Sequence, residues 1–486
     1  MTSMAKPVTG AIFRSWRAGH QVLDRRPRPW KDLRSVSGNA IRPSPNLFPH
    51  VFLSVACLVA CASCAAVAAP LKAAETPQYV FFSIAPYSGW SQDDPQSLTP
   101  ALFLDVRETL QTPDAPSLRV GLLFHINTLL SPLETLQATV ARLCALAEDT
   151  SVPLLLVFDG QNWWESRPDL WNWWDPAKPG YDPKNAWNVE WTDWGPQHAV
   201  KIGWRNWGSQ VRVAPAPNIA SPRVVSEHVQ ALKPLAAQVA AWHRALPREK
   251  KWLCGGIKVG WEAGIGYNAQ YFPNGNEFAE KWPDDPSHDP RLGVDFGVGL
   301  CGGLGHAAAM SAGIRRSGAL TRDDIGLATQ RYLQTLARVA YRAGMPRDKI
   351  FTHQGGNCPP YEEHLPFWPA FNRYSLPGWS FYWGDPAAVE ELRETLARRR
   401  TRTWAAAEWW WGASTAQEWK EHFEKTLGYL DCRFVGVYNW NQGGFKTDPN
   451  ALEGFRALLR EWEGRPGAPG MTRKEQRRSG KAAHDS

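Results

Sequence analysis

The chain has 486 residues, enough to bury a large hydrophobic core, and a formal net charge of +7 at pH 7. Much of the positive charge lies in the first 50 residues and in the last 22, which leaves the middle of the chain close to neutral. A nucleic-acid-binding domain would carry clustered basic residues on its folded part, so we expect no nucleic-acid partner.

Residues 1–50 are rich in arginine and proline and have no hydrophobic periodicity, which predicts a disordered basic extension. Residues 51–74 hold an apolar segment of small side chains that ends in an acceptable signal-peptidase site, Ala66-Val67-Ala68. The 50 residues before it are too many for an ordinary signal-peptide N-region. We therefore expect the true start to lie downstream of Met1.

Two other interpretations of the apolar segment stay open. It is about 20 residues long, the length of a transmembrane anchor, although its alanine, cysteine and serine content favours a cleaved signal. Leu58-Val59-Ala60-Cys61 also resembles a bacterial lipobox, which would make Cys61 a lipidated N-terminus and attach the protein to a membrane. In either case we expect an exported protein, located in the periplasm, on the outer membrane or outside the cell.

From residue 79 onward, short apolar runs alternate with amphipathic segments, which is typical of parallel β/α units. Six helices are expected at 133–148, 221–246, 321–343, 386–399, 416–427 and 449–462. Eight strands are expected at 79–84, 119–124, 153–158, 257–260, 349–352, 378–381, 403–407 and 434–438. The sequence therefore predicts an α/β protein, a (β/α)8 TIM barrel over residues 75–464, followed by a disordered basic tail at 465–486.

Long insertions follow the third and fourth strands, at 163–221 and 263–319. The first carries ten of the 27 tryptophans of the chain. Loops that follow barrel strands lie on the active-site face, so we interpret this insertion as a wall or lid with stacking surfaces for sugars. The alternative is a small subdomain packed on its own indoles, and the two arrangements are compatible.

The cysteines show neither a disulfide framework nor metal-ligand spacing, and Cys254 and Cys432 are expected to be small buried side chains. One loop segment is rich in oxygen ligands suited to calcium, but its prolines favour a solvated loop. The residues concerned are Asp284, Asp285, His288 and Asp289. We predict no metal and no cofactor.

Two glutamates end apolar strands at the expected active-site face. Glu262 ends the fourth strand beside Trp261, and Glu408 ends the seventh strand before three tryptophans. Glycoside cleavage needs two carboxyl groups, one to protonate the leaving oxygen and one to attack the anomeric carbon or activate water. The acid must keep its proton near neutral pH, which apolar or like-charged surroundings favour. The pair predicts a glycoside hydrolase acting on an oligo- or polysaccharide.

A glutamate on strand four and another on strand seven resemble the arrangement of the clan A glycoside hydrolases. The resemblance implies that Glu262 is the acid/base and Glu408 the nucleophile, that Tyr382 contacts the nucleophile, and that Trp440 lies under the reactive sugar. The clan usually has asparagine before the acid/base and arginine on strand two; here these positions hold Trp261 and His125. β-Amylases use the same two strands and invert, so retention is favoured and inversion stays open.

Further polar and aromatic residues near the strand ends are candidates for substrate binding. Asp159 and Glu165 could instead supply the acid, His353 could be an ordinary loop residue, and the asparagines after the eighth strand could cap the backbone. The full set of candidates is Asp159, Asn162, Trp261, Tyr267, Asn268, His353, Gln354, Tyr382, Trp383, Trp409, Asn439 and Trp440. A competing hypothesis is a non-catalytic barrel on the cell surface that only binds glycans.

Overall fold

The computed structural model describes residues 77–84, 89–112, 118–206, 210–269, 304–357, 365–382, 384–440 and 444–463. Several predictions fall outside these residues. They are the basic extension, the signal segment with Cys61, the basic tail, the four oxygen-rich loop residues Asp284, Asp285, His288 and Asp289, and the substrate-binding candidate Trp383.

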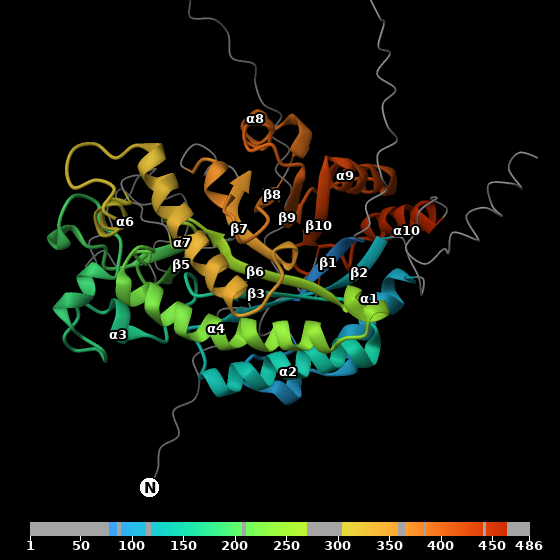
Figure 1. The fold of residues 1–486 in the computed structure, drawn as a ribbon, viewed down its shortest axis with the longest axis horizontal. Coiled ribbons are helices and arrows are strands. Elements are labelled where there is room, and N and C mark those ends of the chain that lie inside the picture. The colour runs from blue at the N-terminus through green and yellow to red at the C-terminus, as the bar shows by residue number, and fades with distance from the viewer. Residues whose placement is uncertain are drawn as a thin grey trace, which may run out of the picture. The chain divides into compact units, whose positions relative to one another are not determined.

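Eight parallel strands close into a barrel in the order β1-β10-β9-β8-β7-β6-β3-β2 (Figure 1). The strands are β1 (Gln78–Ile84), β2 (Leu118–Asn127), β3 (Leu154–Asp159), β6 (Cys254–Ala263), β7 (Ile350–Asn357), β8 (Gly378–Tyr382), β9 (Thr403–Trp410) and β10 (Asp431–Val437). Each overlaps one of the eight predicted strands, so the (β/α)8 barrel is confirmed. Cys254 and Cys432 are buried in β6 and β10, as expected.

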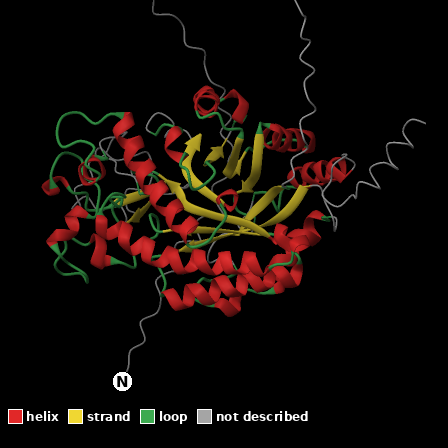
Figure 2. Cartoon of the chain, viewed as in Figure 1, coloured by secondary structure: helices red, strands yellow, loops and turns green. Residues whose placement is uncertain are grey.

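Helices surround this barrel (Figure 2). They are α1 (Pro100–Leu110), α2 (Leu133–Thr150), α4 (Pro222–Ala245), α7 (Arg322–Arg342), α8 (Glu390–Arg398), α9 (Ala416–Gly428) and α10 (Pro449–Glu463). The predicted helices are all present, and a capping box between Thr321 and Asp324 begins α7 where expected. Helix α1 was not predicted, although Pro100 at its first turn and the buried spacing Phe103, Val106, Leu110 are helix signals.

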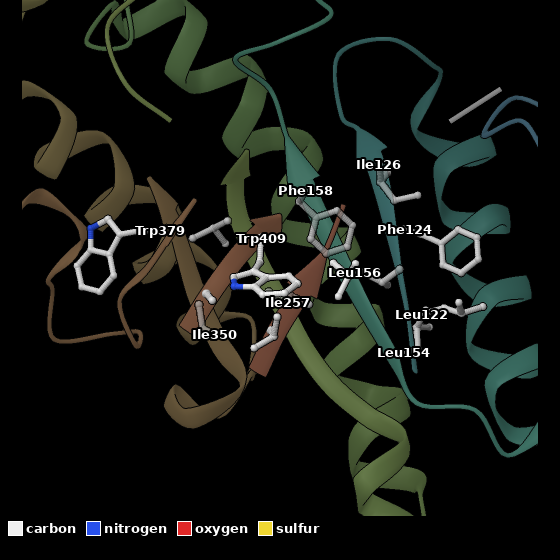
Figure 3. Packing of buried hydrophobic residues seen from close by; sticks show 14 of the residues in the cluster. Leu122, Phe124, Ile126, Leu154, Leu156, Phe158, Ile257, Ile350, Trp379 and Trp409 are labelled. Carbon is white, nitrogen blue, oxygen red and sulfur yellow. The ribbon is translucent and has the colours of Figure 1, made fainter. Parts of the chain in front are cut away.

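The strands alternate their side chains between two separate cores. The outer core lies between strands and helices, and Figure 3 shows Leu122 and Phe124 of β2 pointing toward the neighbouring helix. The inner core fills the barrel with large apolar side chains such as Phe81, Phe351 and Phe434. Burial on both faces explains why the strands appear in the sequence as nearly continuous apolar runs.

The insertion between β3 and α4 packs on its own indoles, the second of the two predicted arrangements. It contains α3 (Pro168–Trp171) and the antiparallel pair β4 (Gly203–Asn206) and β5 (Gln210–Val213). Trp164 and Trp191 are fully buried in a cluster of their own with Leu170 and Val189. The indole N–H groups donate to backbone carbonyls within the insertion, Trp164 to Pro215 at 3.1 Å and Trp191 to Ala186 at 2.6 Å. These two indoles are therefore structural.

The second insertion is held to the first by a buried carboxylate. Glu190 accepts a hydrogen bond from the backbone N–H of Gly305 at 3.0 Å, at the start of the short helix α6 (His306–Ser311). Burial raises the pKa of Glu190 to about 8, although backbone N–H groups of α6 oppose the shift.

Among the residues that the structure describes, no helix has the length and apolar character needed to cross a membrane.

Replacing Trp191 by alanine should lower the free energy of unfolding by about 3–5 kcal/mol, since it removes a fully buried indole from the core of the insertion. Chemical denaturation followed by tryptophan fluorescence would measure the loss. The matched control is Tyr181→Ala in the same insertion, where the ring is 42% exposed and the change should stay within about 0.5 kcal/mol. Equal effects of the two substitutions would contradict a separate core in the insertion.

Candidate active site

Glu262 and Glu408 lie near the C-terminal ends of β6 and β9, the fourth and seventh strands of the barrel in chain order. Both carboxylates are nearly enclosed, with 8% of Glu262 and 4% of Glu408 exposed. Burying a carboxylate costs free energy unless hydrogen-bond donors or cations surround it. The neighbours of the pair therefore determine what it can do.

Strand bulges turn both glutamates toward the barrel axis. Two consecutive residues of β8, Trp379 and Ser380, pair with Ala406 and Glu408 of β9. Ala407 of β9 is therefore an extra residue in that strand. In β6, Val259 and Ala263 pair with Thr352 and Gln354 of β7, which inserts two extra residues before Ala263. Bulges of this kind redirect side chains at the rims of barrels.

The bulge in β6 requires unusual backbone conformations. Gly260 has φ +83° and Glu262 has φ +47°, both in the left-handed region. A non-glycine residue there is uncommon and carries strain that surrounding contacts must hold. An ordinary strand would direct Trp261 and Glu262 to opposite faces. Here Trp261 contacts Glu408 of β9, and Glu262 contacts Ser380 of the adjoining strand β8.

One phenol bridges the two carboxylates. The hydroxyl oxygen of Tyr382 lies 2.5 Å from Glu408 Oε1 and 3.2 Å from Glu262 Oε1. Because both distances meet at one oxygen, the two Oε1 atoms are less than about 6 Å apart, closer than the about 6.5–9.5 Å between the paired carboxyls of inverting glycosidases. A hydroxyl donates one proton, and the shorter contact indicates that Tyr382 donates to Glu408.

Each carboxylate has further donors. Trp261 donates its indole N–H to Glu408 Oε2 at 2.7 Å. Glu262 accepts from Ser380 Oγ at 2.7 Å and from Asn268 Nδ2 at 3.0 Å. The hydrogen bonds thus fix the orientation of both carboxyl groups before any substrate binds.

The charges of the site are coupled. Burial, and then the neighbouring charge of Glu262, raise the pKa of Glu408 to about 7, while Lys258, Tyr382 and Trp261 act in the opposite direction. Two carboxyl groups this close repel each other when both are ionised, so the charge of one favours a proton on the other. A pair that holds one proton offers an acid and a base at the same place.

Two histidines lie below the pair inside the barrel. His353 Nε2 is 2.9 Å from Ser380 Oγ, and His125 Nε2 is 3.1 Å from Ser83 Oγ. Burial, with a smaller contribution from Lys258, holds the pKa of both histidines well below the usual value. Since the hydroxyl of Ser380 donates its hydrogen bond to Glu262, the Nε2–H of His353 donates to Ser380.

Of the predicted substrate-binding residues, the structure brings several to the pair. Trp261, Asn268 and Tyr382 contact the carboxylates directly, and His353 contacts Ser380. Asn162 donates from Nδ2 to the carbonyl of Trp261 at 2.9 Å. Of the tryptophans in the first insertion, Trp163 stacks on Trp261 with ring centroids 6.3 Å apart.

Three predicted contacts are wrong. Trp409 is fully buried in the outer core, because the bulge that directs Glu408 inward turns the next side chain outward, where it donates to Thr426. Gln354 follows the inward-facing His353 and donates to the carbonyl of Pro366. Trp440 packs on Phe82 and donates to Asp105 of α1 at 2.8 Å, so it cannot lie under a sugar.

The remaining candidates have local structural contacts. Asp159 accepts the backbone N–H groups of Gln161 and Asn162, which shapes the turn after β3. Tyr267 is buried against Gly355, where a Cβ atom would collide with its ring. Asn439 has φ +52° at the end of β10 and hydrogen-bonds to Tyr438.

Sequence reasoning missed three residues at the site. Lys258 lies in the middle of β6 and Ser380 in the middle of β8, and each was a single polar residue within an otherwise apolar run. Such interruptions of a buried strand were the available signal. Tyr438, just after β10, lies near both carboxylates, with its ring 6.4 Å from that of Tyr382.

Within the described part of the chain, no cluster of histidine, cysteine and carboxylate side chains could hold a metal ion.

Comparison with known proteins finds no matching family model and no matching curated protein. Among solved structures, the chain is similar to a Bacteroidetes-affiliated family 5 cellulase linked with a polysaccharide utilization locus, at 11% identity and a TM-score of 0.40, covering 83% of this chain and 95% of that one. A family 26 β-mannanase from Bacteroides ovatus has 11% identity and a TM-score of 0.36, covering 82% and 93%.

A 3-keto-D-glucoside 4-epimerase from Escherichia coli is similar at nearly the same level, with 10% identity and a TM-score of 0.34, covering 79% of this chain and 100% of the other. Similarities this distant carry no argument about activity. Conclusions about function depend on the geometry of the site itself.

Replacing Tyr382 by phenylalanine should raise the pKa of Glu408 further above about 7, because the lost hydrogen bond stabilises the charged form. A hydrogen bond to a charged group contributes about 1.5–3 kcal/mol, which corresponds to a shift of about 1–2 pH units. Carbon-13 NMR titration of the glutamate carboxyls, assigned with Glu408→Gln, would measure it. The matched control is Tyr438→Phe, whose hydroxyl bonds to Asn439 instead and whose loss should leave the titration nearly unchanged.

Proposed function

We propose that the protein is a glycoside hydrolase whose catalytic pair is Glu262 and Glu408. The observation that carries the proposal is the meeting of two buried carboxyl groups at one phenol, at the C-terminal end of a closed barrel. Glycoside cleavage requires two carboxyl groups of this kind, one protonated and one ionised. The coupling of the two charges supplies that state near neutral pH.

The roles follow from the strand positions. Glu262 on the fourth strand and Glu408 on the seventh resemble the acid/base and the nucleophile of the clan A glycoside hydrolases, and we assign the two roles accordingly. Hydrogen bonds orient both groups alike, since Glu408 accepts from Trp261 and Tyr382 while Glu262 accepts from Ser380 and Asn268. Burial and the charge of Glu262 raise the pKa of Glu408 to about 7, against the effect of its donors.

The separation of the carboxylates supports retention of configuration. The two Oε1 atoms bridged by Tyr382 are less than about 6 Å apart, whereas inverting enzymes keep their carboxyls about 6.5–9.5 Å apart to admit a water molecule. In the retaining sequence, Glu408 Oε attacks the anomeric carbon while Glu262 protonates the leaving oxygen. Water activated by the ionised Glu262 then releases the sugar from Glu408 and returns the proton to Glu262.

A carbohydrate substrate also agrees with the aromatic side chains beside the pair, of which Trp163 is partly exposed. Trp163 and Trp261 stack with nearly parallel rings, 20° apart, and Trp261 holds Glu408. The C–H face of a sugar packs well on such rings. For residues 51–74, the apolar composition supports export, with Cys61 as the lipid attachment site if the lipobox is used.

Replacing Glu262 or Glu408 by glutamine should lower the turnover of a cleaved glycoside by about 10²-fold or more, because each substitution removes a group that takes part in proton transfer or attack. Sugar binding, followed by calorimetry, should persist. The assay is a panel of aryl glycosides and polysaccharides. The matched control is Glu165→Gln in the first insertion, considered above as an alternative acid, for which turnover should stay within a few fold.

The same assay separates the enzyme from a glycan-binding barrel without activity. A binding protein would hold oligosaccharides and would show no hydrolysis by the wild type on any member of the panel. Hydrolysis that survives in both Glu262→Gln and Glu408→Gln would instead mean that other residues carry the chemistry.

The first product released should have the same anomeric configuration as the substrate. Proton NMR in the first minutes of hydrolysis, before mutarotation, would identify the anomer. An inverted product would require a water molecule between the carboxyl groups and therefore a wider separation than their shared contact with Tyr382 allows.

A further inference from the structure

Lys258 is a charged residue buried in the middle of the barrel. It lies on β6 between Ile257 and Val259, whose side chains belong to the outer core, so its own side chain is directed into the barrel. None of its surface is exposed. Burying an ammonium group costs free energy unless negative charge or acceptors surround it, so its presence there needs a reason.

The ammonium group holds the bulge next to Glu408. Lys258 Nζ donates to the carbonyl oxygen of Ala407 at 2.7 Å, and Ala407 is the extra residue of β9. The same carbonyl lies so close to Gly436 of β10 that a Cβ atom there would be 2.5 Å away. Lys258 therefore contacts the peptide whose displacement turns Glu408 toward Glu262.

The groups facing Lys258 come from several strands. Burial lowers the pKa of Lys258 to about 8. The negative charges of Glu408 on β9 and Glu262 on β6 attract the ammonium group and counteract part of that shift. His125 of β2 and His353 of β7 also lie within range, and the pKa of each is held well below its usual value, so both are neutral near pH 7. Two phenols also lie near the carboxylates: Tyr382 contacts both of them, and Tyr438 has a raised pKa and is neutral. The one cation among these groups is Lys258.

We propose that Lys258 is a positioning residue: its ammonium group balances the charge of the Glu262–Glu408 pair and holds the bulge that directs Glu408. The inference rests on the proposed function for its catalytic meaning. With one proton on the pair and one charge on Lys258, the group is neutral before reaction. It is neutral again when Glu408 is esterified and Glu262 is ionised. No uncompensated charge is therefore buried at either stage.

The test is the pH dependence of kcat/KM in Lys258→Met, which removes the charge and keeps an unbranched side chain. Without the cation, both carboxyl groups are harder to ionise, so the acid and alkaline limbs should both move to higher pH by about 1–3 units. The control is Val157→Ala, since Val157 is the residue of β3 that pairs with Lys258. The Val157→Ala substitution weakens the same part of the inner core without changing its charge. Both limbs of the pH profile of kcat/KM should therefore stay where they are in the wild type.

A second measurement needs no substrate and applies even where Lys258→Met is folded but inactive. Thermal unfolding would compare the wild type, Glu408→Gln, Lys258→Met and the double variant. Removing one carboxylate should raise the Tm more in the Lys258→Met background than in the wild type, because that background lacks the cation. Equal effects in the two backgrounds, or unmoved pH limbs in an active Lys258→Met, would overturn the proposal. A wild type without hydrolysis would refute the proposed function and leave the unfolding test decisive for Lys258.

Discussion

The structure depends on the burial of two carboxyl groups within reach of one phenol. Left alone, such a pair would be strongly unfavourable, since each charge is removed from water and repels the other. The protein offsets this cost with donors from two strands and one loop: Trp261 of β6, Ser380 and Tyr382 of β8, and Asn268 in the loop after β6. Lys258 adds the opposite charge from below. The site is thus a closed network in which each member makes the burial of the others possible.

The backbone adopts strained conformations so that both carboxylates can lie in the site. In a regular strand, successive side chains point alternately into and out of the barrel, so only one of Trp261 and Glu262 could face the barrel axis. The bulges in β6 and β9 avoid that limit, with Glu262 itself held at φ +47°. Inner-core residues below the site, among them Phe351 and Phe434, pack closely and give the strained segment a rigid base. Strain at the rim is therefore possible because the layer beneath it is well packed.

The same bulges explain what could be predicted from the sequence. Strands buried on both faces leave a plain signal in composition, and the eight runs and the two glutamates at their ends were found that way. The direction of a side chain after an extra residue leaves no such signal. Trp409 was predicted to face the substrate because it adjoins Glu408, and the bulge at Ala407 reverses it. Trp440 was predicted by resemblance alone, and its contact with Asp105 depends on the tertiary packing of α1.

Trp261 shows how the network limits the recognition of a substrate. An indole has a single N–H group, and Trp261 uses it to hold Glu408 Oε2. It therefore has no donor left for a sugar hydroxyl, and its ring is buried, in contact with Trp163 and 4.2 Å from the ring of His125. A polar residue at this position could bind both a carboxylate and a hydroxyl. With tryptophan there, the proposed substrate would have to receive the hydrogen bonds to its hydroxyls from other parts of the barrel end.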